Sequence, residues 1–537
     1  MISSRTSALR AVSLFATLVG LSATCGCSTT TVDLASDGGT TDGGTTSATE
    51  CEVVVVGGGA GGLHTAFRLA PTLGSKVCLF EREKELGGRI KDIRLDETDP
   101  NAPRVGVGAR RVMESENVLF ALATELGLEL ETPPSLADLI EARGTFSFSK
   151  DDLAEKKYPT VPASTVADKD RETVLYDTLR ASPERAKLPS AEYPNFQTYV
   201  KKVVGAEGYA FLRDMSRFRA DFEMELDARG YLDYFDEEWD NCCTPSYPKG
   251  GMSAFIRGME TAATKAGARI FKEEGVTSIA KNAAGGYDLV TAKQKVHATK
   301  LVLGLPPSGL DKVTGDVADR IKEQSNYKSI VGAKVATITQ FWPEAWWKAV
   351  KNPAATKDPN VWRAWTTTHC MNFIEIPYEP NVDAGPEDPR AASSTGRNAS
   401  TSGRSSPRKD GQGRGRTPEL TAVFNNGVST PATVTIPKPN KTVVQIWPDA
   451  WHWLKAGATI TNAQLSDWAL EPLAGEPVAL VGEAYWVNRS GWSDGAYKSS
   501  LRLLNTKYGM TLPGLATKSM RPLMSRPRPR TSGPTQR

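Results

Sequence analysis

A run of four valines that leads into a glycine-rich turn constrains the fold of this chain more than any other feature. Residues 53–70 read VVVVGGGAGGLHTAFRLA, a short apolar strand pattern followed by glycines and then by a helical pattern. Gly57, Gly59 and Gly62 have the spacing G-x-G-x-x-G. In such a unit the first glycine makes the turn, the second lets the backbone approach a pyrophosphate, and the third lets the helix pack on the strand. The stretch therefore predicts a dinucleotide-binding turn, with the helix N–H groups facing the phosphates.

An acidic residue follows at the distance that this unit requires. Lys76–Phe80 is predicted to be a short buried strand, and Glu81 stands at its end, 19 residues after Gly62. A carboxylate in this position binds the ribose hydroxyls of the nucleotide. The strand, the glycines, the helix and the acid together indicate an α/β, Rossmann-like domain.

The remaining sequence predicts that this domain is assembled from separated segments. A chain of 537 residues is too long for one ordinary core, and strand patterns return on both sides of a mostly helical stretch. We therefore expect an inserted α+β substrate-binding domain. The predicted segments are 1–27 (signal peptide and lipobox), 28–50 (flexible linker), 51–115, 246–310 and 471–510 (nucleotide-binding domain), 116–245 (helical part of the substrate domain), 311–470 (its second part) and 511–537 (basic tail).

The N-terminus has the pattern of a bacterial export signal. Arg5 and Arg10 precede the apolar run Ala11–Ala23, which is too short to span a membrane as a helix. The run ends in LSATCGCS, which resembles a lipobox with Cys27 after a small residue and Cys25 as the less usual candidate. A plain secretory signal cut nearby is the alternative. We expect an exported chain, tethered by a flexible linker and a lipid anchor to a bacterial membrane or cell envelope.

Two tracts lack the apolar periodicity of a folded domain. Residues 385–417 are rich in Arg, Ser and Gly, and they interrupt sequence that otherwise looks folded; the tail at 511–537 is similar. One interpretation is disorder on the surface. The other is out-of-frame translation of a GC-rich gene, and the sequence leaves both open.

Charge and cysteine content exclude some classes of function. Residues 390–416 and 518–537 each carry a net charge of +6, whereas the whole chain has +3, so the rest is acidic and no nucleic-acid partner is expected. Seven cysteines and four histidines are scattered without a C-x-x-C pair, and no metal site is predicted. Export would permit disulfides, but the sequence does not decide the pairing of Cys242, Cys243 or the other cysteines.

Further motifs indicate which dinucleotide binds at the glycine-rich turn. Gly87-Gly88-Arg89 stands six residues after Glu81, and Gly482-Glu483, Gly491-Trp492 and Gly495-Ala496 stand near the C-terminus. Together with the first motif, this set is similar to the flavin-containing amine oxidase family over most of residues 51–510. The resemblance implies FAD rather than NAD as the bound cofactor.

The resemblance also assigns roles to single residues. It implies that Arg89 lies by the pyrophosphate, that Glu483 reaches the ribityl chain and that Trp492 lines the pocket facing the flavin. Val276 matches a residue at the adenine end, with a place in the core as the alternative. The predicted cofactor-binding residues are Gly57, Gly59, Gly61, Gly62, Glu81, Arg82, Gly88, Arg89, Gly108, Ala109, Arg110, Val276, Gly482, Glu483, Trp492 and Ala496.

Lys334 and Trp492 are the predicted catalytic residues. The family commonly places a lysine on a strand such as GAKVATITQFW, where it holds a water at the flavin. A lysine inside an apolar strand is costly unless it has a partner, which supports this role. A solvent-facing position on the strand is the alternative.

Arg111 directs the prediction toward one branch of the family. The stretch Gly108-Ala109-Arg110-Arg111 matches the G-x-x-R with which L-amino-acid oxidases bind the substrate carboxylate, and a guanidinium fits a carboxylate bidentately. Gly491 and Trp492 are predicted to contact the substrate as well. Glu375, in NFIEIPY, is a further candidate that could favour Lys or Arg as the substrate.

The resemblance therefore predicts oxidative deamination of an L-amino acid. A hydride passes from Cα to the flavin, the imine hydrolyses to a keto acid and ammonia, and molecular oxygen reoxidises the flavin to give hydrogen peroxide. Two alternatives stay open: an FAD-dependent amine or polyamine oxidase, and a catalytically inactive flavin-binding surface lipoprotein. The sequence is compatible with both a monomer and a homodimer.

Overall fold

The computed structural model describes most of the folded body of the chain. The described residues are 48–99, 102, 104–132, 137–167, 169–239, 245–344, 361–366, 373–375, 437–486, 488 and 491–514. The predicted lipobox, nearly all of the linker, the 385–417 tract, most of the basic tail and three cysteines (Cys242, Cys243 and Cys370) lie outside these residues. None of the helices found within the described residues has the length and apolarity that crossing a membrane requires.

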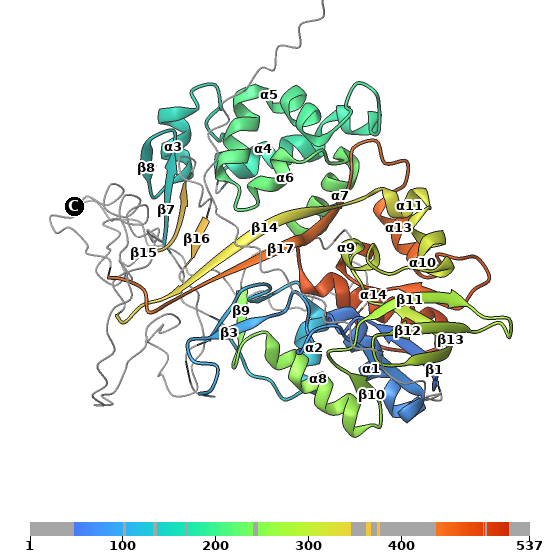
Figure 1. Ribbon diagram of the computed structural model, residues 1–537. Coiled ribbons are helices and arrows are strands. Elements are labelled where there is room, and N and C mark those ends of the chain that lie inside the picture. Colours follow the sequence, from blue (N-terminus) through green and yellow to red (C-terminus); the bar gives the residue numbers. More distant parts are fainter. Residues whose placement is uncertain are drawn as a thin grey trace, which may run out of the picture. The chain divides into compact units, whose positions relative to one another are not determined.

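The main element is a seven-stranded sheet that combines parallel and antiparallel pairs (Figure 1). Its order is β10-β2-β1-β13-β12-β11, and β18 also pairs with β13. The pairs among β10, β2, β1, β13 and β18 are parallel, whereas β13, β12 and β11 pair antiparallel. The strands are β1 (Thr49–Val56), β2 (Val77–Phe80), β10 (Arg269–Phe271), β11 (Val276–Lys281), β12 (Tyr287–Thr291), β13 (Lys295–Leu303) and β18 (Val478–Leu480).

Both faces of this sheet are covered, which explains the four consecutive valines. Val53 and Val55 belong to one core cluster, together with residues of four helices. Val54 and Val56 belong to a second cluster on the opposite face. A parallel strand buried on both faces is uniformly apolar rather than alternating. The helices of the first cluster are α1 (Ala60–Leu73), α2 (Asn117–Glu125), α8 (Ser253–Lys265) and α14 (Ser493–Lys507).

This sheet comes from three separated segments of the chain, and the prediction of an α/β, Rossmann-like fold is confirmed. Two helices from the predicted substrate-domain segments also pack on this sheet. Helix α2 packs in the core of the main sheet although it lies in the predicted helical insert, and α10 (Asp316–Lys322) does the same from the predicted second part of the substrate domain.

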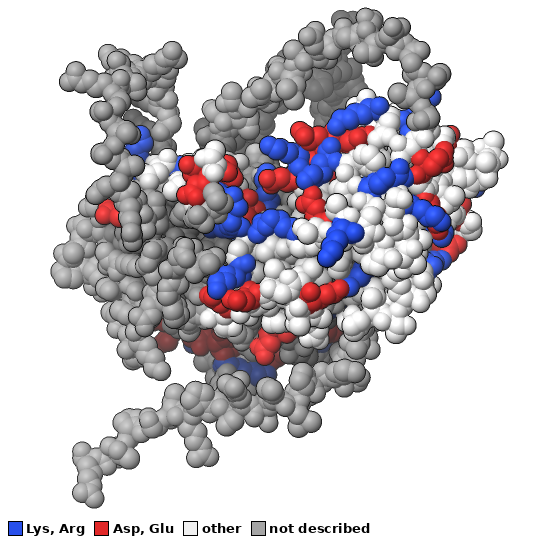
Figure 2. All heavy atoms as spheres, turned by 90° about the horizontal axis from the view of Figure 1, so that it is seen from below, with Lys and Arg blue, Asp and Glu red and all other residues white. Residues whose placement is uncertain are grey.

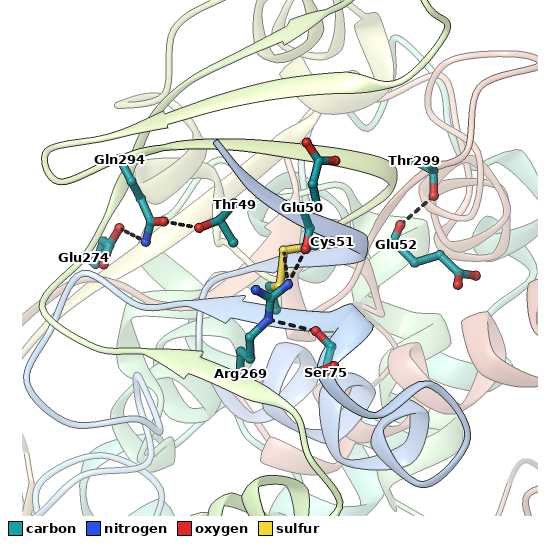
Figure 3. Close-up of a disulfide and its surroundings, with 10 residues drawn as sticks. Thr49, Glu50, Cys51, Glu52, Ser75, Arg269, Glu274, Gln294 and Thr299 are labelled. Carbon is teal, nitrogen blue, oxygen red and sulfur yellow. Dashed lines mark hydrogen bonds between the residues drawn. A yellow bond between two sulfur atoms is a disulfide. The ribbon is translucent and has the colours of Figure 1, made fainter. Parts of the chain in front are cut away.

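A disulfide joins the first two strands of the sheet. Cys51 of β1 bonds Cys78 of β2, and both side chains are buried (Figure 3). Arg269 of β10 donates from Nε to the carbonyl of Ser75 at 2.8 Å and from Nη2 to the carbonyl of Glu50. The three parallel strands are thus linked at one end by a covalent bond and a guanidinium.

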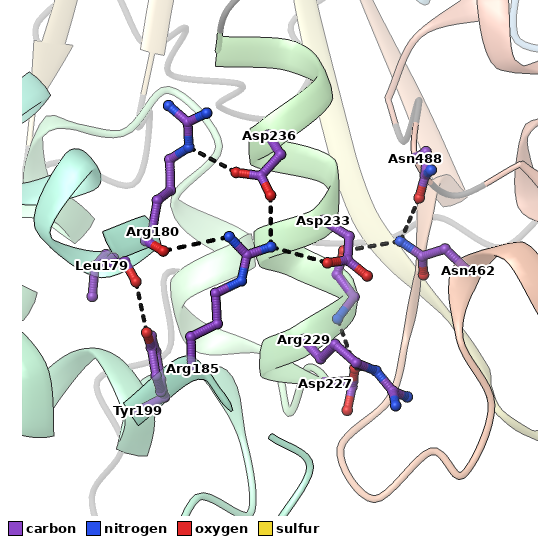
Figure 4. Close-up of polar contacts among 11 residues, drawn as sticks. Leu179, Arg180, Arg185, Tyr199, Asp227, Arg229, Asp233, Asp236, Asn462 and Asn488 are labelled. Carbon is purple, nitrogen blue, oxygen red and sulfur yellow. Dashed lines mark hydrogen bonds and ion pairs between the residues drawn. The ribbon is translucent and has the colours of Figure 1, made fainter. Parts of the chain in front are cut away.

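The helical insert has its own hydrophobic core, which is rich in Tyr and Phe side chains. The elements of the insert are β7 (Ala137–Ala142), β8 (Thr145–Ser147), α3 (Lys150–Lys157), α4 (Arg171–Ala181), α5 (Phe196–Met215), α6 (Arg219–Glu223) and α7 (Ala228–Trp239). Arg185 donates to Asp236 at 2.6 Å and to Asp233 at 3.1 Å, and Arg180 donates to Asp236 at 2.8 Å (Figure 4). These ion pairs fasten the end of α4 and the loop after it to α7.

A long two-stranded ribbon of β14 (Ile330–Phe341) and β17 (Lys441–Leu454) lies between the insert and the main sheet (Figure 1). The antiparallel register runs from Ile330 opposite Leu454 to Phe341 opposite Lys441, with an irregularity between Ala333 and Val335. The remaining elements are β3 (Asp92–Arg94), β4 (Arg104–Gly106), β5 (Val112–Met113), β6 (Leu130–Glu131), β9 (Pro245–Pro248), α9 (Pro307–Leu310), α11 (Ser325–Lys328), β15 (Val361–Thr366), β16 (Phe373–Glu375) and α13 (Asn462–Ala469).

Charged side chains of both signs are interspersed over the face that Figure 2 shows. On the described residues of that face, neither sign forms a continuous stripe. This mixed surface offers no electrostatic track for a polyanion on that side of the molecule.

Candidate functional site

The glycine turn between β1 and α1 leaves open space where a pyrophosphate would bind. Gly57 has φ +98°, and a Cβ on Gly62 would lie 2.1 Å from the Gly57 carbonyl oxygen, so both positions require glycine. A Cβ on Gly59 would instead meet nothing nearer than the Gly304 carbonyl oxygen at 4.0 Å. Helix α1 begins directly after Gly59, with no side-chain cap and no acidic residue in its first turn. Free N–H groups at a helix start beside open space fit a bound pyrophosphate.

Two other glycine motifs close around this turn. The Gly87 amide donates to the Gly58 carbonyl at 2.9 Å, and Gly88, at φ +57°, approaches Gly59 so closely that its Cβ would lie 3.4 Å from the Gly59 Cα. From the C-terminal segment, Gly482 and Ala496 pack against Gly61, whose Cβ would lie 3.2 Å from the Gly482 nitrogen and 3.1 Å from the Ala496 oxygen. The structure thus brings together three motifs that are far apart in the sequence.

Glu81 stands at the end of β2, as predicted. Its Oε2 accepts from the Gly58 amide at 2.7 Å, which ties the acid to the glycine turn. Arg82 beside it is exposed, and its Cβ packs against Gly275. Val276 begins β11 next to this segment and is 9% exposed within the second core cluster. Its predicted role at the adenine end of the cofactor stays a prediction.

Arg89, which is 29% exposed, and the buried Glu483 form the centre of a charge cluster. The Arg89 guanidinium donates from Nη1 to Glu483 Oε2 at 2.7 Å and to the Ala450 carbonyl at 2.9 Å. His452 donates its backbone amide to Glu483 Oε1 at 3.0 Å, and its Nδ1 lies 2.8 Å from Oε2. The Gly491 amide donates to Oε1 at 3.1 Å. Both oxygens of Glu483 are therefore engaged by donors of this chain, and its predicted contact with a ribityl group stays untested.

The charges in this cluster hold one another in the ionised state. Burial alone would raise the pKa of Glu483, but the positive charges of Arg89 and His452 outweigh it and lower this pKa to about 2. Burial would lower the pKa of His452, but Glu483 and Asp449 outweigh that effect and raise it. His452 is fully buried, so its protonated form is favoured by these two carboxylates and not by solvent. The sequence analysis missed His452; its only local signal is a histidine between two tryptophans of a strand.

The predicted substrate-binding stretch touches both Arg89 and Trp492. A Cβ on Gly108 would lie 1.8 Å from the Arg89 carbonyl oxygen, to which the Ala109 amide donates at 3.1 Å. The guanidinium carbon of Arg111 lies 5.9 Å from the centre of the Trp492 ring. Arg110 is half-buried in the same loop. Arg111 and Trp492 are thus brought together from opposite ends of the chain.

Lys334 and Glu375 have less support from the structure. Lys334 lies at the irregularity of β14, one residue from Ala333, which pairs with Trp451. Its side chain is exposed, on the opposite face of the strand from the buried Ala333, so the argument that burial must be compensated by a partner does not hold. Its catalytic role stays a prediction. Glu375 ends β16, where its backbone pairs with Arg363, and its side chain lies outside the described part of the structure.

An aromatic cavity next to Gly491 was not found from the sequence. It is lined by Phe218, Asp221, Tyr234, Trp451, Trp453 and Gly491. Asp221 comes from α6 and the tryptophans come from β17, more than 200 residues later, so no local motif could point to it. Among the described residues, no group of three or more His, Cys, Asp or Glu side chains is arranged to hold a metal ion.

Comparisons with known proteins assign this architecture. A profile of the flavin containing amine oxidoreductase family matches residues 60–373, more than half of the chain. The chain belongs to this family. A segment of 80 residues is 38% identical to flavin-containing amine oxidase B of Rattus norvegicus; it covers 15% of this chain and only 14% of that protein.

The fold resembles solved structures of putrescine oxidase. The wild-type enzyme bound to putrescine matches with a TM-score of 0.58 and 14% identity, over 86% of this chain and 100% of that chain. A triple mutant of the same enzyme matches with a TM-score of 0.57 and 15% identity over the same shares. At this identity the likeness concerns the fold.

The family establishes the cofactor and the class of reaction. The protein is an FAD-dependent oxidoreductase that acts on CH–NH₂ groups, and the open space beside Gly59 fits the pyrophosphate of that cofactor. The predicted membership of the flavin amine oxidase family is confirmed. The narrower prediction of the L-amino-acid oxidase branch gains no support, since the named relatives are amine oxidase B and putrescine oxidase.

Proposed function

We propose that this protein oxidises a primary amine and passes the electrons to molecular oxygen. The observation that carries the proposal is the aromatic cavity beside Gly491, because Gly491 also donates to Glu483 in the cofactor cluster. The cavity has room for about one water-sized group, and its mostly aromatic wall with few polar groups, next to the cofactor cluster, suits one end of a small substrate. The named relatives, an amine oxidase and a putrescine oxidase, support the same class of substrate.

The proposed reaction moves two electrons and two protons from the amine to oxygen. The carbon next to the amine gives up two electrons and, with the nitrogen, two protons, so that the C–N single bond becomes an imine. FAD, when bound, supplies the two-electron acceptor. Oxygen takes up the two electrons and two protons as hydrogen peroxide, and water hydrolyses the imine to an aldehyde and ammonia.

The residues of this chain have separate parts in that reaction. The glycine turn and Arg89 would hold the pyrophosphate of the cofactor. Glu483 and the Ala450 carbonyl fix Arg89 in place, and His452 in turn bonds Glu483. The rings of Trp451, Trp453 and Trp492 exclude water from the substrate. An apolar wall lowers the pKa of an amine and favours its neutral form, which is the form that gives up electrons.

One observation favours a second candidate, oxidation of an α-amino acid. Arg111 lies beside Trp492, and a guanidinium near the reacting carbon would bind a carboxylate. In this case the product is a keto acid rather than an aldehyde. The third possibility is a flavin-binding lipoprotein without turnover, in which no added substrate would reduce the flavin.

The test is anaerobic addition of substrates to the purified full-length, FAD-loaded protein. We expect amines to bleach the visible absorption band of oxidised FAD, and readmitted oxygen to restore it with formation of hydrogen peroxide. Arg111→Met separates the two candidates. If Arg111 binds a carboxylate, this variant loses roughly 30-fold or more in kcat/KM for an amino acid but little for the corresponding decarboxylated amine. Equal rates for the variant and the wild type on amino acids would exclude the second candidate. If no compound bleaches the flavin band, the third possibility, the inactive lipoprotein, is the one that remains.

We also propose that the chain is exported and anchored by lipid at Cys27. The disulfide between Cys51 and Cys78 supports export, because such bonds persist in oxidising compartments. Detergent partitioning of the wild type and of Cys27→Ala tests the anchor. The wild type should enter the detergent phase and the variant the aqueous phase. If both partition alike, Cys27 is not the modified residue.

A further inference from the structure

Asp221 is a buried carboxylate in the wall of the aromatic cavity. It is 3% exposed and lies on α6, facing Trp451 and Trp453 of β17. The rings of Phe218 and Trp451 meet edge to face with centres 5.4 Å apart, and those of Tyr234 and Trp453 do so at 4.8 Å. The cavity has room for about one water-sized group.

Every side-chain donor that reaches Asp221 from the described part of the chain is neutral. The indole Nε1 atoms of Trp451 and Trp453 donate to Oδ1 at 2.7 and 2.8 Å, and the Tyr231 hydroxyl donates to Oδ2 at 3.4 Å. A carboxylate is rarely buried without a cationic partner, because its desolvation is costly. The site therefore has an unbalanced negative charge within a ring of aromatic side chains.

We propose that Asp221 and the surrounding aromatic rings bind a second ammonium group of the substrate, and that the enzyme therefore prefers diamines to monoamines. The proposal rests on the proposed oxidation of amines. A carboxylate supplies charge, and the faces of Trp and Tyr rings attract cations. An ammonium group is also close in size to the water molecule that the cavity can hold.

The cavity lies within reach of the residues that would hold the reacting end of such a substrate. Gly491 forms part of its wall and donates to Glu483 of the cofactor cluster at 3.1 Å. Trp492 follows directly and donates from Nε1 to the hydroxyl of Tyr234 at 3.3 Å. Residues of the cofactor side and of the Asp221 side are therefore neighbours, so a substrate with an amine at each end could contact both.

The charge of Asp221 depends on pH in the range where the enzyme would work. Burial raises the pKa of Asp221 to about 7, although the hydrogen bonds from Trp451, Trp453 and Tyr231 oppose this rise. Burial also keeps Tyr231 and Tyr176 neutral, because their pKa values lie well above 10. Binding of an ammonium group should thus strengthen as the pH rises through about 7, when the carboxylate ionises.

The experiment compares unbranched diamines with monoamines of the same chain length on the FAD-loaded full-length protein. The ratio of the two kcat/KM values isolates the second ammonium group, because both substrates have the same reacting amine. We expect the wild type to favour the best diamine by at least about tenfold, and Asp221→Asn to lose most of this preference. Asparagine keeps an oxygen for the indoles but has no charge. Asp214→Asn is the matched control, because Asp214 is equally buried in the insert but bonds Tyr158 and Arg213 instead.

The outcomes separate the two levels of the proposal. If no amine reduces the flavin, the proposed function fails. If monoamines reduce it as well as diamines do, amine oxidation stands and the role of Asp221 is wrong. A wild-type preference that Asp221→Asn retains in full also overturns the role of Asp221. If the variant fails to fold, the pH dependence of the wild type tests the proposal. The ratio of kcat/KM for the diamine to that for the monoamine must then rise with pH through about 7, and a ratio that does not change with pH contradicts the proposal.

Discussion

Glu483 and Asp221 are buried to the same extent, 3% exposed each, but their surroundings give them opposite properties. Glu483 meets the charges of Arg89 and His452, and its pKa falls to about 2. Asp221 meets two indoles and a phenol, and its pKa rises to about 7. The difference teaches that burial alone does not determine the state of an acid. The charge of Glu483 is balanced within the protein, whereas that of Asp221 is left for a ligand to balance.

The largest expected effect comes from removing the charge of Glu483. Glu483→Gln leaves the buried His452 and the partly exposed Arg89 beside a neutral amide, and it should lower the free energy of unfolding by about 3–5 kcal/mol. Because the folded-state pKa is depressed, the stabilisation is present above pH 4.5 and is lost as the pH falls from 4.5 toward about 2. Urea denaturation at several pH values measures this loss.

Glu471→Gln is the control for that variant. Glu471 pairs with Lys507 on the surface, where solvent screens the pair, so its loss should change the free energy of unfolding far less than the loss of Glu483 does. Equal losses for the two variants would show that the cluster around Glu483 is no more important to stability than a surface pair.

His452→Gln should have the next largest effect, about 2–3 kcal/mol, because it leaves two carboxylates without their shared cation. The pKa of His452 is raised in the folded state, so its stabilisation is fully present below pH 6.5 and is lost as the pH rises through the folded pKa. The difference in stability between wild type and variant should therefore shrink in alkaline solution. A difference that grows with pH would mean that His452 is neutral in the folded protein.

Asp221→Asn should show a pH dependence across the acidic and neutral range that distinguishes it from Glu483→Gln. The raised pKa of Asp221 means that its contribution is present below pH 3.8 and is lost as the pH rises toward about 7. Between about pH 5 and pH 8, the variant should gain about 2–3 kcal/mol relative to the wild type. Thermal or urea unfolding of both proteins at the two pH values measures the gain. If there is no gain, the charge of Asp221 is balanced by groups of the protein, as that of Glu483 is.

The smallest effect is expected for Trp453→Phe. This change removes one indole donor from Asp221 and keeps the ring, at a cost of about 1 kcal/mol. It should also raise the pKa of Asp221 further, so the rise of the diamine preference should move to higher pH. Kinetic profiles of the two proteins measure that displacement, and a displacement to lower pH would mean that the indole does not stabilise the ionised carboxylate.

The two acids also differ in how far the sequence could predict them. The glycine spacing, Glu81 and the Gly482-Glu483 motif indicated the cofactor side, because phosphate binding by a backbone turn requires particular residues at fixed spacing. Asp221 could not be found, because its partners Trp451 and Trp453 meet it only through the packing of the insert on β17. The assignment of Lys334 relied on its apolar neighbours. It did not use Pro448 of the facing strand, which marks the irregularity, since a proline within a paired strand indicates an edge or a bulge.

The alternation of β17 has a consequence for how this enzyme can change over evolution. Trp451 and Trp453 point to Asp221, while His452 between them points to Glu483 on the opposite side. Successive residues of a strand face opposite ways, so inserting or deleting one residue exchanges the two sets. Such an event would remove substrate recognition and cofactor support in a single step. From Trp451 to Trp453, a lineage that keeps the cofactor site is therefore expected to change specificity by substitution and not by a one-residue insertion or deletion.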